Sequence, residues 1–183
     1  MAWLALIAGV ALWWGAHLWK RVAPESRARF GDPGKGIVTG LLVLAIVLMT
    51  LGYRGAEGAF FWGRSPALVG INNLLMLLAF YLFASSGPKT RITRVVKNPQ
   101  LTAFKIWAAS HLLVNGDVPS FVLFGGLLAW AVVEVIVLKR AGVPWEPPHP
   151  APIKKEVTAI VAAIVATIVV MLIHYWLGVV PWG

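Results

Sequence analysis

Residues 36–53 read GIVTGLLVLAIVLMTLGY and contain no charged side chain. A stretch of this length and composition is typical of a helix that crosses the hydrocarbon core of a bilayer, which takes about 20 apolar residues. Further apolar runs occupy residues 2–19, 66–86, 101–114, 120–138 and 157–180. The sequence therefore predicts an all-α, polytopic transmembrane bundle of about six helices, forming one integral membrane domain over residues 1–183.

The overall composition agrees with this fold class. Of the 183 residues 59% are hydrophobic and only 13% are charged, whereas about a quarter of the residues of soluble domains are charged. The formal net charge is +9, but the cations gather between the apolar runs, which is where a membrane protein meets anionic head groups. This distribution favours the lipid bilayer as partner and argues against nucleic acid. The absence of cysteine excludes disulfides, thiolate zinc sites and a cysteine nucleophile.

The loop cations predict an orientation. Lysine and arginine are concentrated at 20–35, 89–97 and 139–155, whereas 54–65 and 115–119 hold few or none. Because cytoplasmic loops carry the excess of basic residues, alternate loops face the cytoplasm and both termini lie on the outer (periplasmic) side of a bacterial inner membrane. The run 101–114 is short, but leaving it out would place a basic loop on the wrong side. The proline-rich segment 143–152 is expected to be a non-helical linker.

Strongly polar residues inside spanning segments are costly, so each of them is a candidate site residue. The candidates are His17, Asn72, Asn73, Lys105, His111, Asn115, Asp117, Glu134 and His174. The alternative interpretation is a polar contact between helices, or, for His17 and His174, a histidine in the aromatic belt near a helix end. Glu134 and Asn115 are expected to face the bundle interior, because an unpaired carboxylate or amide in hydrocarbon is unfavourable.

Two histidines on different helices can hold haem b in a membrane bundle. Neutral imidazoles supply both axial bonds, and a neighbouring cation such as Arg21 can pair with the propionates. Spacing alone leaves interhelical polar contacts as the alternative. Zinc is disfavoured, since no three ligands are obviously close and cysteine is absent. His149, in the proline-rich linker, is expected to be solvated.

Two blocks carry a family resemblance. Residues 105–117, KIWAASHLLVNGD, and residues 123–131, LFGGLLAWA, resemble the NnrU family, whose members are membrane proteins associated with nitrite and nitric oxide reduction in denitrifying bacteria. Gly15-Ala16-His17 and Leu172-Ile173-His174 are similar to the two ends of that family, so the resemblance covers nearly the whole chain. It implies a role linked to nitrogen-oxide metabolism.

The NnrU family is in turn similar to the plastid 15-cis-zeta-carotene isomerase, an integral membrane enzyme that uses haem b. This resemblance implies that His17 and His111 are axial ligands of the haem iron. Arg21 and Asn115, each four residues further along the chain, complete the set of haem-binding candidates. The resemblance also implies a possible activity, haem-dependent cis-trans isomerisation of a polyene such as zeta-carotene.

The chain departs from the isomerase pattern at two places. A cysteine that is an alternative ligand there, three residues before the second histidine, is Ala108 here, so a redox ligand switch of that kind is absent. The Arg-His-Pro motif is Lys97-Asn98-Pro99 here, which removes one histidine.

Three functions therefore compete. The first is a haem-b membrane protein acting in nitrogen-oxide metabolism or as a polyene isomerase. The second is a haem-free accessory or assembly protein for a respiratory membrane oxidoreductase. The third is a membrane methyltransferase of the isoprenylcysteine type, which would need a cytosolic cofactor pocket near its C-terminus. The sequence argues against the third, because it ends at residues 181–183 directly after the last apolar run.

Overall fold

The structure is a computed structural model that describes residues 1–142 and 144–182. Val143, the first residue of the expected proline-rich linker, and Gly183 lie outside the described residues. The chain forms two compact units, and each is described by itself. The first unit comprises Met1–Phe61 and Gly116–Val137, and the second comprises Trp62–Asn115 and Leu138–Gly183.

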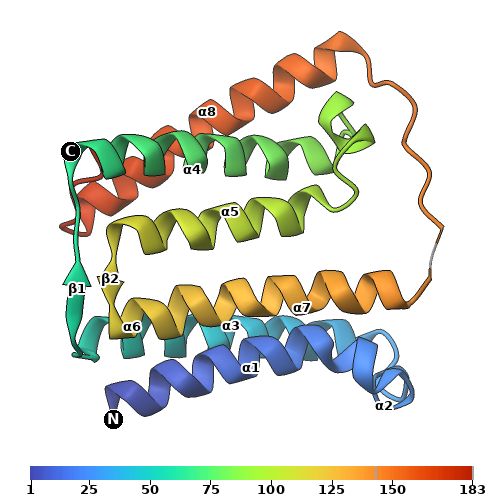
Figure 1. Cartoon of the computed structure of the whole chain (residues 1–183). Coiled ribbons are helices and arrows are strands. Elements are labelled where there is room, and N and C mark those ends of the chain that lie inside the picture. The colour runs from blue at the N-terminus through green and yellow to red at the C-terminus, as the bar shows by residue number, and fades with distance from the viewer. Residues whose placement is uncertain (143, 183) are drawn as a thin grey trace. The chain divides into compact units, whose positions relative to one another are not determined.

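The helices of the first unit come from the two separate segments of the chain that form it (Figure 1). They are α1 (Ala2–Val22), α2 (Pro24–Ala28), α3 (Pro33–Gly55), α6 (Val118–Ser120), the π-helical segment η2 (Phe121–Gly125) and α7 (Gly126–Arg140). The last three follow one another without a break. A short strand, β1 (Phe60–Trp62), pairs with β2 (Gly116–Asp117) immediately before α6.

The second unit is built on three longer helices. They are α4 (Pro66–Ser86), α5 (Pro99–Val114) and α8 (Ile153–Trp176), with the short 3-10 helix η1 (Arg91–Arg94) between α4 and α5. Helix α5 lies alongside α4 (Figure 1). The two helices bury Ala79, Leu82 and Ala103 between them. Residues 144–152 are not helical, as the prolines of the linker predict.

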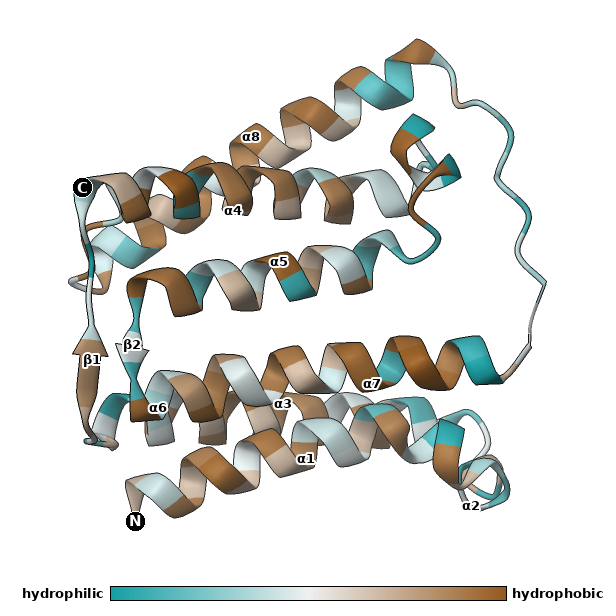
Figure 2. Ribbon diagram, in the orientation of Figure 1, coloured by the Kyte–Doolittle hydropathy of each residue, from teal (hydrophilic) through white to brown (hydrophobic). Residues whose placement is uncertain are grey.

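Five of these helices are long and apolar enough to cross a membrane. They are Ala2–Val22, Pro33–Gly55, Pro66–Ser86, Val118–Arg140 and Ile153–Trp176. Their outer surfaces are rich in exposed large apolar side chains, and on α8 alone these include Ile160, Ile164 and Ile168. The expected multi-pass, all-α membrane fold is therefore confirmed. Figure 2 shows hydrophilic residues at the C-terminal end of α7 and at the N-terminal end of α8.

The sixth expected segment, 101–114, is helical but shorter than a typical span. It forms α5, which has 16 residues and is therefore about 24 Å long, against about 30 Å for the hydrocarbon core. The helix also carries Lys105, Ser110 and His111. Its length and polarity set it apart from the other five helices.

Local sequence signals explain where the helices begin and end. The expected helix 66–86 has the observed bounds of α4, because Pro66 occupies the first turn and Ser65 Oγ accepts a hydrogen bond from the Leu68 N–H. The expected helix 157–180 is shifted in the structure, since α8 begins at Ile153 and ends at Trp176. It ends early because Gly178 adopts a φ of 88°, which stops a right-handed helix.

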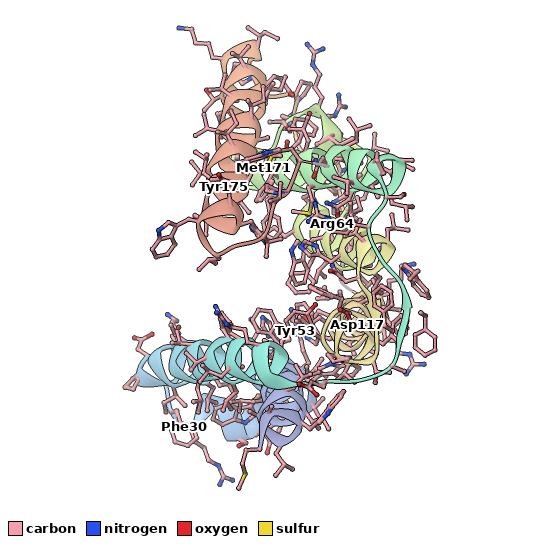
Figure 3. All side chains as sticks on the ribbon, turned by 90° about the vertical axis from the view of Figure 1, so that its left-hand side faces the viewer. Phe30, Tyr53, Arg64, Asp117, Met171 and Tyr175 are labelled. Carbon is pink, nitrogen blue, oxygen red and sulfur yellow. The ribbon has the colours of Figure 1, made fainter. Side chains whose placement is uncertain are left out.

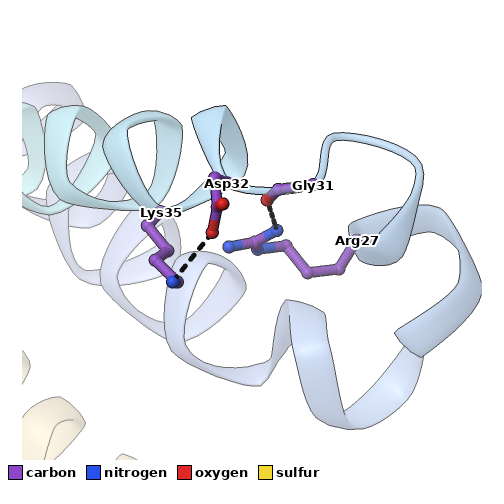
Figure 4. A network of polar contacts seen from close by, with 4 residues as sticks. All are labelled: Arg27, Gly31, Asp32 and Lys35. Carbon is purple, nitrogen blue, oxygen red and sulfur yellow. Dashed lines mark hydrogen bonds and ion pairs between the residues drawn. The ribbon is translucent and has the colours of Figure 1, made fainter.

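The loop between α1 and α3 is polar and open to the solvent. Lys35 Nζ lies 2.9 Å from Asp32 Oδ1, and the two side chains are 79% and 91% exposed. Arg27 donates to the carbonyl of Gly31 in the same loop (Figure 4). Ion pairs this exposed contribute little to stability.

Helices α1 and α3 approach each other closely at glycine. A Cβ atom at Gly52 of α3 would lie 2.6 Å from the Cα of Leu6 in α1, and Leu6 is fully buried. The Cα of Leu6 is a main-chain atom, which cannot move aside as a flexible side chain does. We therefore expect Gly52→Ala to lower the free energy of unfolding by about 2 kcal/mol through overpacking.

Gly40→Ala is the matched control for this prediction, because a Cβ at Gly40, also in α3, meets nothing within 4 Å. Thermal unfolding of the detergent-solubilised protein measures both variants. A midpoint that falls for Gly52→Ala and stays near the parent value for Gly40→Ala supports the α1–α3 contact. Equal midpoints for the two variants would contradict it.

The membrane topology gives a second prediction. If α5 carries the chain back across the membrane, both termini lie on the outer side. A phosphatase fused to the C-terminus is then active, and a fluorescent protein at the same position is dark. A fluorescent C-terminal fusion together with an inactive phosphatase would contradict the predicted topology, and α5 is the first segment whose crossing it would bring into question.

Candidate functional site

His17 lies between two tryptophan rings in the first unit. It follows Trp13 by one turn of α1, and the centroids of their rings are 4.4 Å apart. The ring of Trp130 in α7 is also 4.4 Å from that of His17. Because side chains four residues apart share a helix face, α1 presents Trp13, His17 and Arg21 in a row. Opposite them, α7 presents Trp130 and Glu134.

The hydrogen bond of His17 fixes which ring nitrogen carries the proton. His17 Nδ1 lies 3.0 Å from the main-chain carbonyl oxygen of Trp13. A carbonyl oxygen only accepts hydrogen bonds, so Nδ1 must be the donor. In the neutral imidazole the lone pair is therefore on Nε2, which is the usual arrangement of a histidine that binds a metal.

An ion pair with a buried carboxylate lies one turn further along both helices. Arg21 Nε donates to Glu134 Oε1 over 3.1 Å. Glu134 is only 7% exposed, and within the described part of the chain its Oε2 is buried without a hydrogen-bond partner. The carboxylate thus depends on Arg21 for its charge compensation. The expectation that Glu134 faces the interior of the bundle is confirmed.

The start of α7 is attached to α1 beside this row. Trp14 Nε1 donates to the carbonyl oxygen of Gly126 over 3.0 Å, directly after the π-helical segment η2. A π-helical turn changes the register of the helix and leaves carbonyls for side-chain donors. A Cβ at Gly126 would lie 2.9 Å from Val10 Cγ1, so the small residue allows the close approach of α7 to α1.

A polar network fixes the N-terminal end of the continuous helix formed by α6, η2 and α7. Tyr53 Oη and Ser120 Oγ are 2.8 Å apart. Asp117 Oδ1 accepts from the Ser120 N–H over 2.8 Å and caps the helix that starts at Val118. Tyr53 and Asp117 are labelled in Figure 3. Asp117, a candidate from the sequence, thus acts as a helix cap and holds the Ser120 partner of Tyr53.

His111, in the second unit, also forms a hydrogen bond within its own helix and also lies beside a tryptophan ring. Its Nδ1 lies 2.8 Å from the carbonyl oxygen of Trp107, so by the same reasoning Nε2 bears the lone pair of the neutral ring. The rings of Trp107 and His111 are 5.1 Å apart. Asn115 Nδ2 donates to the carbonyl oxygen of His111 over 2.8 Å. This bond joins Asn115, which follows α5 directly, to the last turn of that helix.

His174 lies in α8 of the second unit. Its Nδ1 lies 2.8 Å from the carbonyl oxygen of Val170, so its ring has the same kind of main-chain hydrogen bond as those of His17 and His111. A second imidazole in the same unit makes His174 an important control in any test of His111.

The asparagine pair of α4 holds the C-terminal segment. Asn73 Nδ2 donates to the carbonyl oxygen of Pro181 over 3.0 Å, and Asn72 Nδ2 donates to Asn73 Oδ1 over 3.3 Å. Arg64 donates to the carbonyl oxygen of Val180. These bonds give Asn73 a packing role at this end of the unit, which the sequence left undecided.

The structure brings the predicted residues together in pairs. His17 and Arg21 lie on one face of α1 in the first unit, and His111 and Asn115 share a hydrogen bond in the second. Sequence reasoning did not find Trp130, although its four-residue spacing from Glu134 is a signal that both face the same neighbour.

Comparison with known proteins identifies a family. The family model NnrU, described as NnrU protein, matches residues 5–181 of the chain. No curated protein and no solved structure matches the chain.

Proposed function

The chain belongs to the NnrU family of multi-pass membrane proteins, and from this premise we propose that it binds haem b in the bacterial inner membrane through His17 and His111. The observation that carries the proposal is the hydrogen bonding of the two rings. Each Nδ1 donates to the carbonyl oxygen four residues earlier, which orients the ring and directs the Nε2 lone pair away from its own helix. The donor chemistry therefore suits axial ligation.

Two further side chains fit roles beside the ligands. Arg21 uses only Nε in its bond to Glu134, and a guanidinium has four more N–H donors. With a side chain that is 31% exposed, Arg21 can also bind a propionate. Asn115 acts as a positioning residue, because its amide bonds the main-chain carbonyl of His111 and so restrains the last turn of α5.

Bound haem would supply a redox-active iron inside the membrane. Two activities follow from the family resemblance, namely a role in nitrite or nitric oxide metabolism and isomerisation of a polyene. Ala108 is fully buried and offers no ligand atom, so a ligand exchange at that position is not part of the proposal. Turnover of nitrite or nitric oxide, compared with isomerisation of a cis-polyene such as zeta-carotene, separates the two activities.

An absorption spectrum of the detergent-purified protein, produced with full haem supply, tests haem binding. We expect a Soret band in the oxidised protein and split α and β bands on reduction. The same preparation from cells without the gene controls for contaminating cytochromes.

A haem-free accessory protein is the second candidate, and one observation favours it. His17 is already packed between Trp13 and Trp130, one helical turn from the Arg21–Glu134 ion pair. Such packing also suits a purely structural histidine. A colourless protein from haem-supplied cells would support this candidate and contradict the haem proposal.

A further inference from the structure

A basic groove lies at the η1 end of the second unit. It is lined by Arg91 and Arg94 of η1, by Val95, and by Pro147 and Pro150 of the linker, and its volume is about 390 Å³. Small-molecule sites have volumes of about 300–1,000 Å³. Within the described residues neither guanidinium forms an ion pair. The groove therefore offers two guanidinium groups without an ion-pair partner among the described residues, beside an apolar wall.

A second groove, which is apolar, runs between α4 and α8 of the same unit. Its lining includes Leu74, Leu78 and Tyr81 from α4, and Ile160 and Ile164 from α8. Ile160 and Ile164 are 47% and 44% exposed, and Leu74 is 71% exposed. Exposed apolar side chains along a groove between two spanning helices suit a hydrocarbon chain.

The two grooves approach each other at η1. Helix α4 ends at Ser86, shortly before η1, and the first turn of α8 is tied to η1 because Glu156 Oε1 accepts from the Arg91 main-chain N–H. Tyr81 lies five residues before the end of α4, and Ile160 lies four residues after Glu156. At 1.5 Å per residue the apolar groove thus ends about 6–8 Å from the level of η1.

We propose that this surface binds an anionic phospholipid, with its phosphate at Arg91 and Arg94 and an acyl chain in the groove between α4 and α8. Guanidinium groups bind phosphate through paired N–H donors. The basic loop also lies on the predicted cytoplasmic side, where anionic lipids attract such residues. The nearby carboxylates are Glu156, which uses Oε1 on the main chain of Arg91, and the exposed Glu146 of the linker. The proposal does not depend on haem.

Native mass spectrometry of the full chain in detergent, titrated with phosphatidylglycerol or with phosphatidylcholine of the same chains, tests the proposal. We expect tighter binding of phosphatidylglycerol to the parent. In the Arg91→Gln/Arg94→Gln double variant its affinity is expected to fall about thirtyfold, since each cation near an anionic surface contributes about a factor of five. Arg91→Lys/Arg94→Lys retains both charges and is expected to recover most of the preference.

Lys139→Gln/Arg140→Gln is the matched control. It removes two charges from exposed residues on the same predicted side but outside the groove, and it is expected to leave the affinity unchanged. Equal binding of the two lipids by the parent, or equal losses in the two glutamine double variants, would overturn the proposal. Competition by inorganic phosphate or glycerol phosphate at concentrations similar to those of the lipid would also overturn it, because the acyl chain would then contribute nothing.

Discussion

Arg21→Ala is expected to lower the free energy of unfolding of the first unit by about 3 kcal/mol. Removing one partner of a buried ion pair typically costs about 3–5 kcal/mol, because the other charge stays buried without compensation. Glu134 is 7% exposed and its Oε2 has no hydrogen-bond partner among the described residues. Since Arg21 itself is 31% exposed, the effect should lie at the lower end of this range.

Lys35→Ala is the control for Arg21→Ala. It also removes the cation of an ion pair with a carboxylate, but this pair lies in the open loop of Figure 4. Its effect is expected to stay below about 1 kcal/mol. Chemical denaturation in a mild detergent measures both variants. In the double variant Arg21→Ala/Glu134→Leu, stability should be largely recovered, because no charge is left buried. Equal effects of Arg21→Ala and Lys35→Ala would show that the Arg21–Glu134 pair does not stabilise the fold.

The second large effect is expected on haem. His17→Ala and His111→Ala should each lower the haem content or convert the spectrum from six-coordinate low-spin to five-coordinate, because each change removes an axial imidazole. The loss in affinity should reach at least the tenfold to hundredfold that is typical of changes beside the ligands. The absorption spectrum and the haem-to-protein ratio of the purified variants measure it.

Two other histidines serve as controls for this prediction. His149→Ala, in the non-helical linker, is expected to change neither the spectrum nor the haem content. His174→Ala is the sharper control, because its ring has the same kind of main-chain hydrogen bond as those of His17 and His111. If His174→Ala abolishes haem binding while His17→Ala leaves the spectrum intact, the proposed ligands are wrong.

Much of the fold follows from local sequence signals. The uncharged runs predict the spanning helices, and Pro66 with its Ser65 cap predicts the start of α4, because these signals act within one turn. The end of α8 was missed because apolar composition continues to Val180, whereas the helix stops where Gly178 takes a positive φ. Hydrophobicity alone does not register a change in backbone conformation.

The candidate site was predictable only in part. His17, Arg21 and Glu134 stand out in the sequence as polar residues in apolar segments. The pairing of Arg21 with Glu134, however, joins residues 113 positions apart, and only the packing of α7 on α1 brings them together. The same packing places Trp130 against His17. Spacing along one helix shows which side chains share a face, but it does not identify the helix opposite.

Haem binding by His17 and His111 is the central claim, and titration of haem into protein purified without haem supply tests it most directly. The parent is expected to develop a low-spin, six-coordinate spectrum that saturates with added haem, and His17→Ala/His111→Ala is expected to show only the spectrum of unbound haem. A parent that takes up no haem, or a double variant that gives the parent's spectrum at the same affinity, would contradict the claim.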